Sequence, residues 1–458
     1  MSAVRQELRF LSALKISSEN FQCLKNSTNK PRTEVRGKRK GFCDFGAVRF
    51  ADDKKFKGRI AFGFMGFDAG KIRKDFAVLR AAGAPAYFDS ACMSLKPDCV
   101  VAKMNEYYSQ YPACAGRSAH KLGKKVEEEV LRARIEAAKF FNARRESEIV
   151  FTRNTTEGIN IVANGLGLKK GDRVLISDKE HNSNLVPWLF LAQKSGIKVE
   201  VFEFGNMDDF RKKVKGAKFV SVVQTSNLDG SSQDAREIAK IAHSNGAMIL
   251  IDAAQSAPHH KVDVRDIDCD FMVCSGHKML GPTGTGILYG KQEALAKLGQ
   301  FIVGGDTVTN TTYSSFTPDK VPERFEAGLQ DYAGIIGLGE AIRYLKKIGI
   351  GEIEKCEQAL NKKLSEGLQK LGIEIIGGEW SERGGIASFS IKGMEAHDIA
   401  LMLNESGICV RSGMHCVHSW FNARKMKGSV RASFYFYNTE DEVEFFLKKI
   451  KEIKMLAG

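Results

Sequence analysis

From about residue 71 onward, short runs of apolar, often β-branched residues alternate with longer segments in which apolar residues recur at helical spacing. The short runs, each expected to be a strand, lie at 148–152, 173–177, 198–202, 218–224, 247–252 and 271–275. Segments with helical spacing lie between several of these runs, at 126–142, 184–195 and 234–245. Strands that alternate with helices build parallel βαβ units. The chain is therefore expected to be an α/β protein with a mostly parallel central sheet covered by helices.

The pattern changes after about residue 335. Helical segments and short strand-like runs now follow one another in mixed order, at 338–348, 353–371, 373–376, 385–391, 396–406, 408–411, 429–433 and from 441 onward. Such an order predicts a smaller α+β domain. We expect a large domain over 71–335 and a small C-terminal domain over 336–458, with 71–88 able to pack against the small one.

Residues 1–70 carry 15 basic and 7 acidic residues, and so hold +8 of the net charge of +14. This segment is polar and aperiodic, which predicts a disordered basic extension. Two possibilities stay open for it: an organelle-targeting segment, although its seven acidic residues argue against the acid-poor type, and a stretch that is not made, with Met65 as the initiator. Apart from such targeting, we expect a cytoplasmic protein. The rest of the chain has no pronounced basic stripe, so nucleic acid is not expected as a partner.

The ten cysteines are scattered, with no C-x-x-C pair and no paired zinc spacing. This usage is typical of reduced thiols in a reducing compartment. The neighbouring residues His415, Cys416 and His418 suggest metal ligation, but no fourth ligand stands at a usual spacing, so no metal site is expected. No apolar run approaches the ~18 residues of a membrane span.

Two ionisable residues stand where predicted strands end. Asp252 closes the run 247–252, and Lys278 follows the run 271–275. The ordinary interpretations are an aspartate that caps the next helix and a lysine at the surface. The carboxyl ends of parallel strands meet at one edge of a sheet, where ligands usually bind. The pair fits a carbonyl cofactor that forms a Schiff base with Lys278, while Asp252 keeps a ring nitrogen protonated.

Several motifs, in order, resemble the class V aminotransferase-fold enzymes that use pyridoxal phosphate, and are most similar to cysteine desulfurases of the SufS type. They are SGHKMLGPTG at 275–284, preceded by VDV at 262–264 and DCDF at 268–271, and VRSGMHC at 410–416. The resemblance extends from about residue 71 to the C-terminus. It implies the fold of pyridoxal-phosphate-dependent transferases of fold type I and a homodimer.

The resemblance also implies roles for the residues that would surround the cofactor. Lys278 would hold it covalently, Asp252 would pair with its ring nitrogen, and Gln255 would hydrogen-bond its ring oxygen. His181 would stack on the ring and act in catalysis. The cofactor's phosphate would be bound at a helix N-terminus and the end of a strand, by Thr155, Thr156, Ser275 and His277. Without the family, the two threonines would be ordinary helix caps.

On the substrate side, Cys416 would be the nucleophile that accepts sulfur. Arg431 would bind the substrate carboxylate, for which a planar guanidinium is suited. Asn227 and Arg411 would also lie near the substrate. The sequence departs from the family pattern at three positions. Asn154 replaces a usual Gly, Cys92 a usual Ala, and Leu329 a Thr that reaches the phosphate of the neighbouring subunit.

The resemblance thus implies a cysteine desulfurase that converts L-cysteine to L-alanine and passes the persulfide sulfur to an iron–sulfur scaffold, a sulfur carrier or a tRNA-thiolation acceptor. Two alternatives keep the fold: a selenocysteine lyase, or another class V aminotransferase-type enzyme. A third is a binding subunit without catalysis, but such a protein would need neither Lys278 nor Cys416.

Overall fold

The computed structural model describes residues 69–456. The expected extension over 1–70, including Met65, falls almost wholly outside these described residues. The first described elements are two short helices, α2 (Ala69–Ile72) and α3 (Ala77–Arg80).

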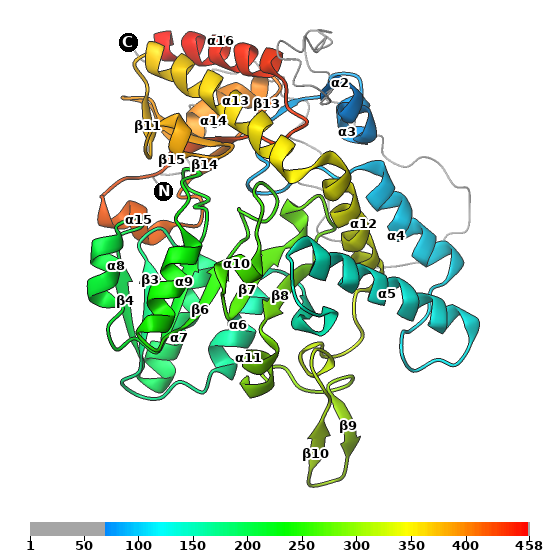
Figure 1. Cartoon of the computed structure of the whole chain (residues 1–458). Helices are drawn as coiled ribbons and strands as arrows, with labels where there is room; N and C mark the ends of the chain where they lie inside the picture. The colour runs from blue at the N-terminus through cyan, green and yellow to red at the C-terminus, as the bar shows by residue number, and fades with distance from the viewer. Residues whose placement is uncertain (1–68, 457–458) are drawn as a thin grey trace, which may run out of the picture. The chain divides into compact units, whose positions relative to one another are not determined.

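Seven strands form the central sheet, in the spatial order β2-β8-β7-β6-β5-β3-β4 (Figure 1). Neighbouring strands pair in parallel except β8, which runs antiparallel to β2 and β7. The predicted mostly parallel sheet is confirmed. The strands are β2 (Ile149–Thr152), β3 (Arg173–Ser177), β4 (Lys198–Phe202), β5 (Phe219–Val223), β6 (Met248–Asp252), β7 (Phe271–Ser275) and β8 (Gly286–Gly290).

The inner strands of this sheet are buried on both faces. In β6, Ile249 and Ile251 pack in one apolar core, and Leu250 between them packs in another. Successive side chains of a strand point to opposite faces. A strand that is apolar throughout therefore has to lie between two layers, and this is why these strands are continuous apolar runs in the sequence.

Helices form both layers. The first core takes side chains from α4 (Asp98–Gln110), α5 (Lys121–Phe140), α8 (Met207–Lys213), α9 (Ala235–Ser244), α10 (Val264–Ile267) and α12 (Tyr332–Ile348). The second core takes them from α6 (Thr155–Gly165), α7 (Asn182–Ser195) and α11 (Gln292–Lys297). The helices expected at 126–142, 184–195 and 234–245 correspond to α5, α7 and α9.

A second, antiparallel sheet lies in the C-terminal part, in the order β11-β12-β15-β14. Its strands are β11 (Glu374–Ile376), β12 (Ile386–Ser390), β14 (Arg411–Gly413) and β15 (Ser429–Ser433). The helices α13 (Ile350–Lys370), α14 (Ala396–Glu405) and α16 (Glu440–Leu456) share an apolar core with it, and α15 (His418–Ala423) follows β14. This mixture matches the expected α+β character, while the domain boundaries at 70 and 335 stay predictions.

Before the chain reaches the large sheet, it passes along the C-terminal part of the fold and forms a separate two-stranded sheet there. Strand β1 (Ala86–Tyr87) pairs in parallel with β13 (Ile408–Cys409), and Phe88 packs edge-on against Phe434 and Phe446. Residues 86–92 are thereby placed beside the C-terminal sheet. Their position matters for the cavity described below.

Two features were not predicted from the sequence: strand β8 and a projecting hairpin. Strand β8 is bounded by glycines, and a Cβ on Gly286 would lie 2.7 Å from the Cα of Asn154, so only glycine lets the start of α6 approach this closely. The hairpin of β9 (Val308–Thr311) and β10 (Phe316–Pro318) projects from the rest of the fold (Figure 1).

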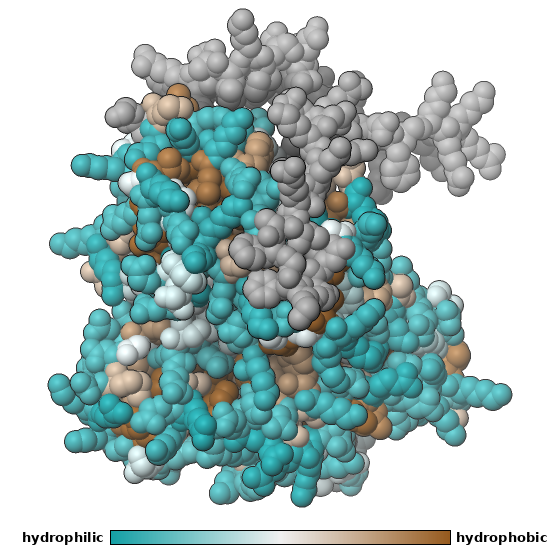
Figure 2. Space-filling model, turned by 45° about the horizontal axis from the view of Figure 1, so that its top comes forward, coloured by the Kyte–Doolittle hydropathy of each residue, from teal (hydrophilic) through white to brown (hydrophobic). Residues whose placement is uncertain are grey.

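Within residues 69–456, no helix combines the length and the apolarity that crossing a membrane requires. On the face shown in Figure 2, hydrophilic residues cover most of the described surface, with apolar residues in small groups among them.

Candidate active site

The carboxyl ends of the parallel strands carry the predicted site residues. Asp252 is the last residue of β6 and Ser275 the last of β7, while His181 follows β3 and Asn227 follows β5. Thr155 begins α6 shortly after β2. Because these ends meet at one edge of the sheet, side chains far apart in the sequence come together there.

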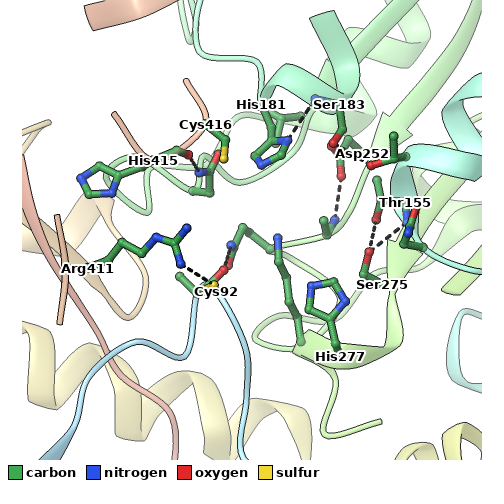
Figure 3. Close-up of a pocket in the computed structure, with 18 of the residues that line it drawn as sticks. Cys92, Thr155, His181, Ser183, Asp252, Ser275, His277, Arg411, His415 and Cys416 are labelled. Carbon is green, nitrogen blue, oxygen red and sulfur yellow. Dashed lines mark hydrogen bonds between the residues drawn. The ribbon is translucent and has the colours of Figure 1, made fainter. Parts of the chain in front are cut away.

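A cavity of about 240 Å³ opens at this edge. All twelve site residues predicted from the sequence line it: Thr155, Thr156, His181, Asn227, Asp252, Gln255, Ser275, His277, Lys278, Arg411, Cys416 and Arg431. The sheet edge supplies one wall, the small C-terminal sheet supplies the opposite wall, and Cys92 reaches in from the segment after β1 (Figure 3). The structure thus brings every predicted site residue together, and their chemical roles remain proposals.

Lys278 ends the short 3₁₀ helix Gly276–Lys278 that follows β7. Burial lowers the pKa of its ammonium group, and the charge of Asp252 opposes this effect. Asp252 itself is only 2% exposed, and burial raises the pKa of its carboxyl group. Its Oδ1 accepts a hydrogen bond of 2.9 Å from the backbone N–H of Ala254, which fixes the carboxylate at the cavity wall. A lysine with a lowered pKa is a better base and nucleophile than a solvated one.

The N-terminus of α6 forms one end of the cavity. The Thr155 N–H donates to Ser275 Oγ at 2.9 Å, and the two hydroxyls are 2.7 Å apart. Asn154 caps the helix, because its Oδ1 accepts from the Glu157 N–H. The hydroxyl groups and the partial positive charge of a helix N-terminus suit an anion. His277 lines the same cavity, and burial lowers its pKa to about 4.

The ring of His181 is held as a neutral imidazole. Its Nδ1 accepts a hydrogen bond of 3.0 Å from the Ser183 N–H at the start of α7. An accepting Nδ1 leaves the proton on Nε2. Burial lowers the pKa of this histidine to about 3, so that it remains neutral at physiological pH.

Gln255 and Asn227 join the cavity to neighbouring segments. Gln255 Nε2 donates to the backbone oxygen of Ala91 at 2.8 Å, and Asn227 Nδ2 donates to the backbone oxygen of His415 at 2.6 Å. The second contact connects the loop after β5 to the segment that carries Cys416.

Two arginines lie side by side on the wall formed by the small sheet, because Arg411 of β14 is the register partner of Arg431 of β15. Arg431 is 3% exposed; it donates to the Asn227 backbone oxygen at 2.9 Å and to Asp89 Oδ1 at 3.4 Å. Arg411 is more exposed, and its Nη1 donates to the Cys92 Sγ at 2.9 Å. This wall is cationic, with Asp89 between the two guanidinium groups.

Cys416 stands on a left-handed turn. The φ angles of His415 and Cys416 are +50° and +60°, a region that residues other than glycine seldom occupy. The backbone oxygen of Cys416 accepts from the Asn182 N–H at 2.8 Å. Positive φ at two successive residues is a strained arrangement of the kind that functional sites often hold.

The cavity walls fit pyridoxal phosphate. A lysine amine can bond to the aldehyde, a buried carboxylate can accept from a protonated ring nitrogen, and the α6 N-terminus can bind the phosphate. Four buried polar atoms of cavity-lining residues have no hydrogen-bond partner within residues 69–456: Asn227 Oδ1, Gln255 Oε1, His415 Nδ1 and Arg431 Nε. Such atoms are expected where a polar ligand is to bind.

Sequence reasoning assigned no role to several residues that build the site. Asp89 pairs with Arg431, and Ser183 bonds to His181 through its N–H and to Thr156 through its hydroxyl. Ser183 could have been found from the sequence, because it stands two residues after His181. Asp89 could not, because its partner Arg431 lies 342 residues away in the chain. Leu329 is 72% exposed and does not line this cavity. No cluster of metal-ligand side chains occurs in the described part of the chain.

Comparison with known proteins supports the family resemblance. Residues 86–446 match the sequence profile of the family described as Aminotransferase class-V. A probable cysteine desulfurase of Synechocystis sp. is 40% identical over 398 residues, which cover 84% of this chain and 95% of that protein. A probable cysteine desulfurase of Pyrococcus abyssi is 40% identical over 391 residues, which cover 83% of this chain and 96% of that protein.

Solved structures agree with the sequence relatives. The apo cysteine desulfurase of Thermococcus onnurineus superposes with a TM-score of 0.82 at 39% identity, covering 84% of this chain and 98% of that one. The S-sulfonic acid form of the cysteine desulfurase CsdA of Escherichia coli gives a TM-score of 0.78 at 32% identity, covering 85% and 99%. Since the family profile spans most of the chain and the relatives match along nearly their whole length, the chain belongs to the aminotransferase class-V family.

Proposed function

We propose that the protein is a pyridoxal-phosphate-dependent cysteine desulfurase. The observation that carries the proposal is that Lys278, Arg431 and Cys416 line one cavity, so that an amine, a carboxylate-binding group and a thiol face the same space. An α-amino acid with sulfur in its side chain needs these three partners. The names of the relatives, which are 40% identical, support the same activity.

Bound pyridoxal phosphate supplies an electron sink that makes the α-proton of an amino acid acidic. Lys278 Nζ takes that proton and later returns a proton to the product, a task for which burial has lowered its pKa. Asp252 would hold the cofactor's ring nitrogen protonated. His181, which is neutral and fixed by the Ser183 N–H, would pack against the cofactor's ring.

Arg431 binds the substrate carboxylate. Its guanidinium is fixed by the Asn227 backbone oxygen and by Asp89, and its buried Nε has no hydrogen-bond partner among the described residues. A charged, preorganised donor of this kind gives a strong hydrogen bond to a carboxylate. The substrate is thereby oriented with its side chain toward the segment that carries Cys416.

Cys416 takes the sulfur. Its Sγ, as thiolate, attacks the sulfur of L-cysteine; the C–S bond breaks, an S–S bond forms, and the electron pair left on the carbon is protonated to give L-alanine. The products are L-alanine and a Cys416 persulfide. His415 does not hold the thiol proton, because burial lowers its pKa to about 2 and keeps its ring neutral.

The direct test is incubation of the purified holoenzyme with L-cysteine and a reductant, with alanine and sulfide measured together. Equal amounts of both are expected. Pyruvate and ammonia in place of alanine would indicate a β-elimination and overturn the proposal.

The partners follow from the product. A persulfide requires a thiol acceptor, so we propose that the physiological acceptor is an iron–sulfur scaffold or a sulfur carrier that reaches Cys416. We also propose a homodimer, in which residues 324–328 serve the neighbouring cavity. The cytoplasmic location remains a proposal from the sequence.

A further inference from the structure

Two thiols line the cavity, and the reaction above uses only one. Of the eight free cysteines within the described residues, Cys92 and Cys416 are the two in the cavity lining. Cys92 accepts a hydrogen bond from Arg411, and Arg411 belongs to the same segment as Cys416 (Figure 3). This hydrogen bond therefore joins Cys92 to the segment that carries Cys416.

The two thiols are held in different ways. The segment of Cys92 is fixed at many points: Cys92 N–H donates to the Asp89 backbone oxygen, Ala91 N–H to Ser433 Oγ, and Ser90 Oγ bonds to the Tyr437 hydroxyl. Cys416 instead lies on a left-handed turn that costs energy for residues other than glycine. The Cys416 backbone oxygen is held by the Asn182 N–H, but the strained turn would gain by relaxing, so the movement that a sulfur transfer needs is assigned to Cys416.

The wall around Cys92 suits an anionic sulfur species. Arg411 contacts its Sγ, and Arg431 lies beside Arg411 in register; within residues 69–456, Asp89 is the one acidic residue that forms an ion pair with either arginine. Arg431 Nε is buried and has no partner among the residues described. A persulfide anion on Cys92 would meet two guanidinium groups, a type of partner that binds anions strongly.

We propose that Cys92 is a second sulfur-bearing residue, which takes the sulfane sulfur from the Cys416 persulfide. The Cys92 thiolate attacks the terminal sulfur. The S–S bond to Cys416 breaks, a new S–S bond forms to Cys92, and the electron pair leaves with Cys416 as its thiolate. One persulfide and one thiolate remain, so the step needs no oxidant or reductant. The proposal rests on the desulfurase function and adds a second place for its product.

The test is a burst measurement on the holoenzyme with L-cysteine, without reductant or acceptor. Wild-type protein should form two L-alanine per subunit, with Cys416 modified first and Cys92 later, as found by rapid quenching, thiol alkylation and mass spectrometry of the peptides. Cys92→Ser keeps a hydrogen-bond acceptor for Arg411 but cannot take sulfur, so it should stop at one alanine, with persulfide on Cys416 alone. Exposed Cys114 is the internal control and should remain unmodified.

Three results would overturn the relay: a wild-type burst of one alanine, a second sulfur chained on Cys416, or a Cys92→Ser burst equal to the wild type. Persulfide on Cys92 in Cys416→Ser would also overturn it, because sulfur would then arrive without Cys416. A wild-type protein that forms no alanine would instead remove the proposed function, and the relay with it.

Discussion

Replacement of Arg431 by alanine should weaken the interaction with L-cysteine by one to two orders of magnitude. The guanidinium is 3% exposed and held in place by the Asn227 backbone oxygen and Asp89, so no water-filled surroundings screen its contact with a carboxylate. A hydrogen bond to a charged group contributes about 1.5–3 kcal/mol. At about 1.4 kcal/mol per factor of ten, this is a roughly 10–100-fold increase in KM.

The chain contains a matched control for this experiment. Arg411 lies opposite Arg431 in register, but its side chain is 43% exposed, and an exposed charge contributes only about 0.2–1 kcal/mol. Arg411→Ala should therefore raise KM by less than about fivefold. Both variants are assayed for alanine formation over a range of L-cysteine concentrations, with thermal unfolding to confirm the fold. An Arg431→Ala KM within twofold of the wild type, or a larger effect from Arg411→Ala, would refute the assignment.

Three further predictions concern the cofactor, pH and assembly. Lys278→Ala should form no alanine, because it removes the covalent attachment and the base; measurable turnover by this variant would contradict the role. Burial lowers the pKa of His415 to about 2 in the folded protein, whereas the pKa is about 6.5 in the unfolded chain. Between these values only the unfolded state binds the proton, so the free energy of unfolding decreases as the pH is lowered. In urea titrations, the free energy of unfolding should drop between pH 7 and pH 5 by about 2 kcal/mol less in His415→Gln than in the wild type, and equal drops would show that His415 already titrates in the folded state. Sedimentation at assay concentrations should give a dimer, and a fully active monomer would exclude a shared site.

The sequence predicted the central sheet well because its strands are buried on both faces and so form uninterrupted apolar runs. Strand β8 was not predicted because it is bounded by Gly286 and Gly290, which are uncommon in strands, and because it is antiparallel to both of its neighbours and so belongs to no βαβ unit. The projecting β9–β10 pair is mostly exposed and has no apolar pattern to reveal it.

Some residues of the candidate site could likewise be predicted from the sequence, and others could not. Asp252 and Lys278 could be inferred because strand ends have a fixed place in a parallel sheet. The pairing of Arg411 with Arg431, and the contacts of Asp89 and Cys92 with these arginines, depend on the register of a small antiparallel sheet and on segments more than 300 residues apart. No local pattern encodes such contacts.

The proposed role of Cys416 as the acceptor of the sulfur of L-cysteine can be tested with the Cys416→Ser holoenzyme. In this variant, the sulfane sulfur derived from labelled L-cysteine is located by mass spectrometry while the cofactor spectrum is recorded. Serine changes the volume little and is a far poorer sulfur acceptor, so we expect a normal cofactor spectrum, no protein-bound sulfur and alanine formation at background level. Wild-type alanine formation by this variant, or label in the wild type found first on another cysteine such as Cys409, would contradict the claim.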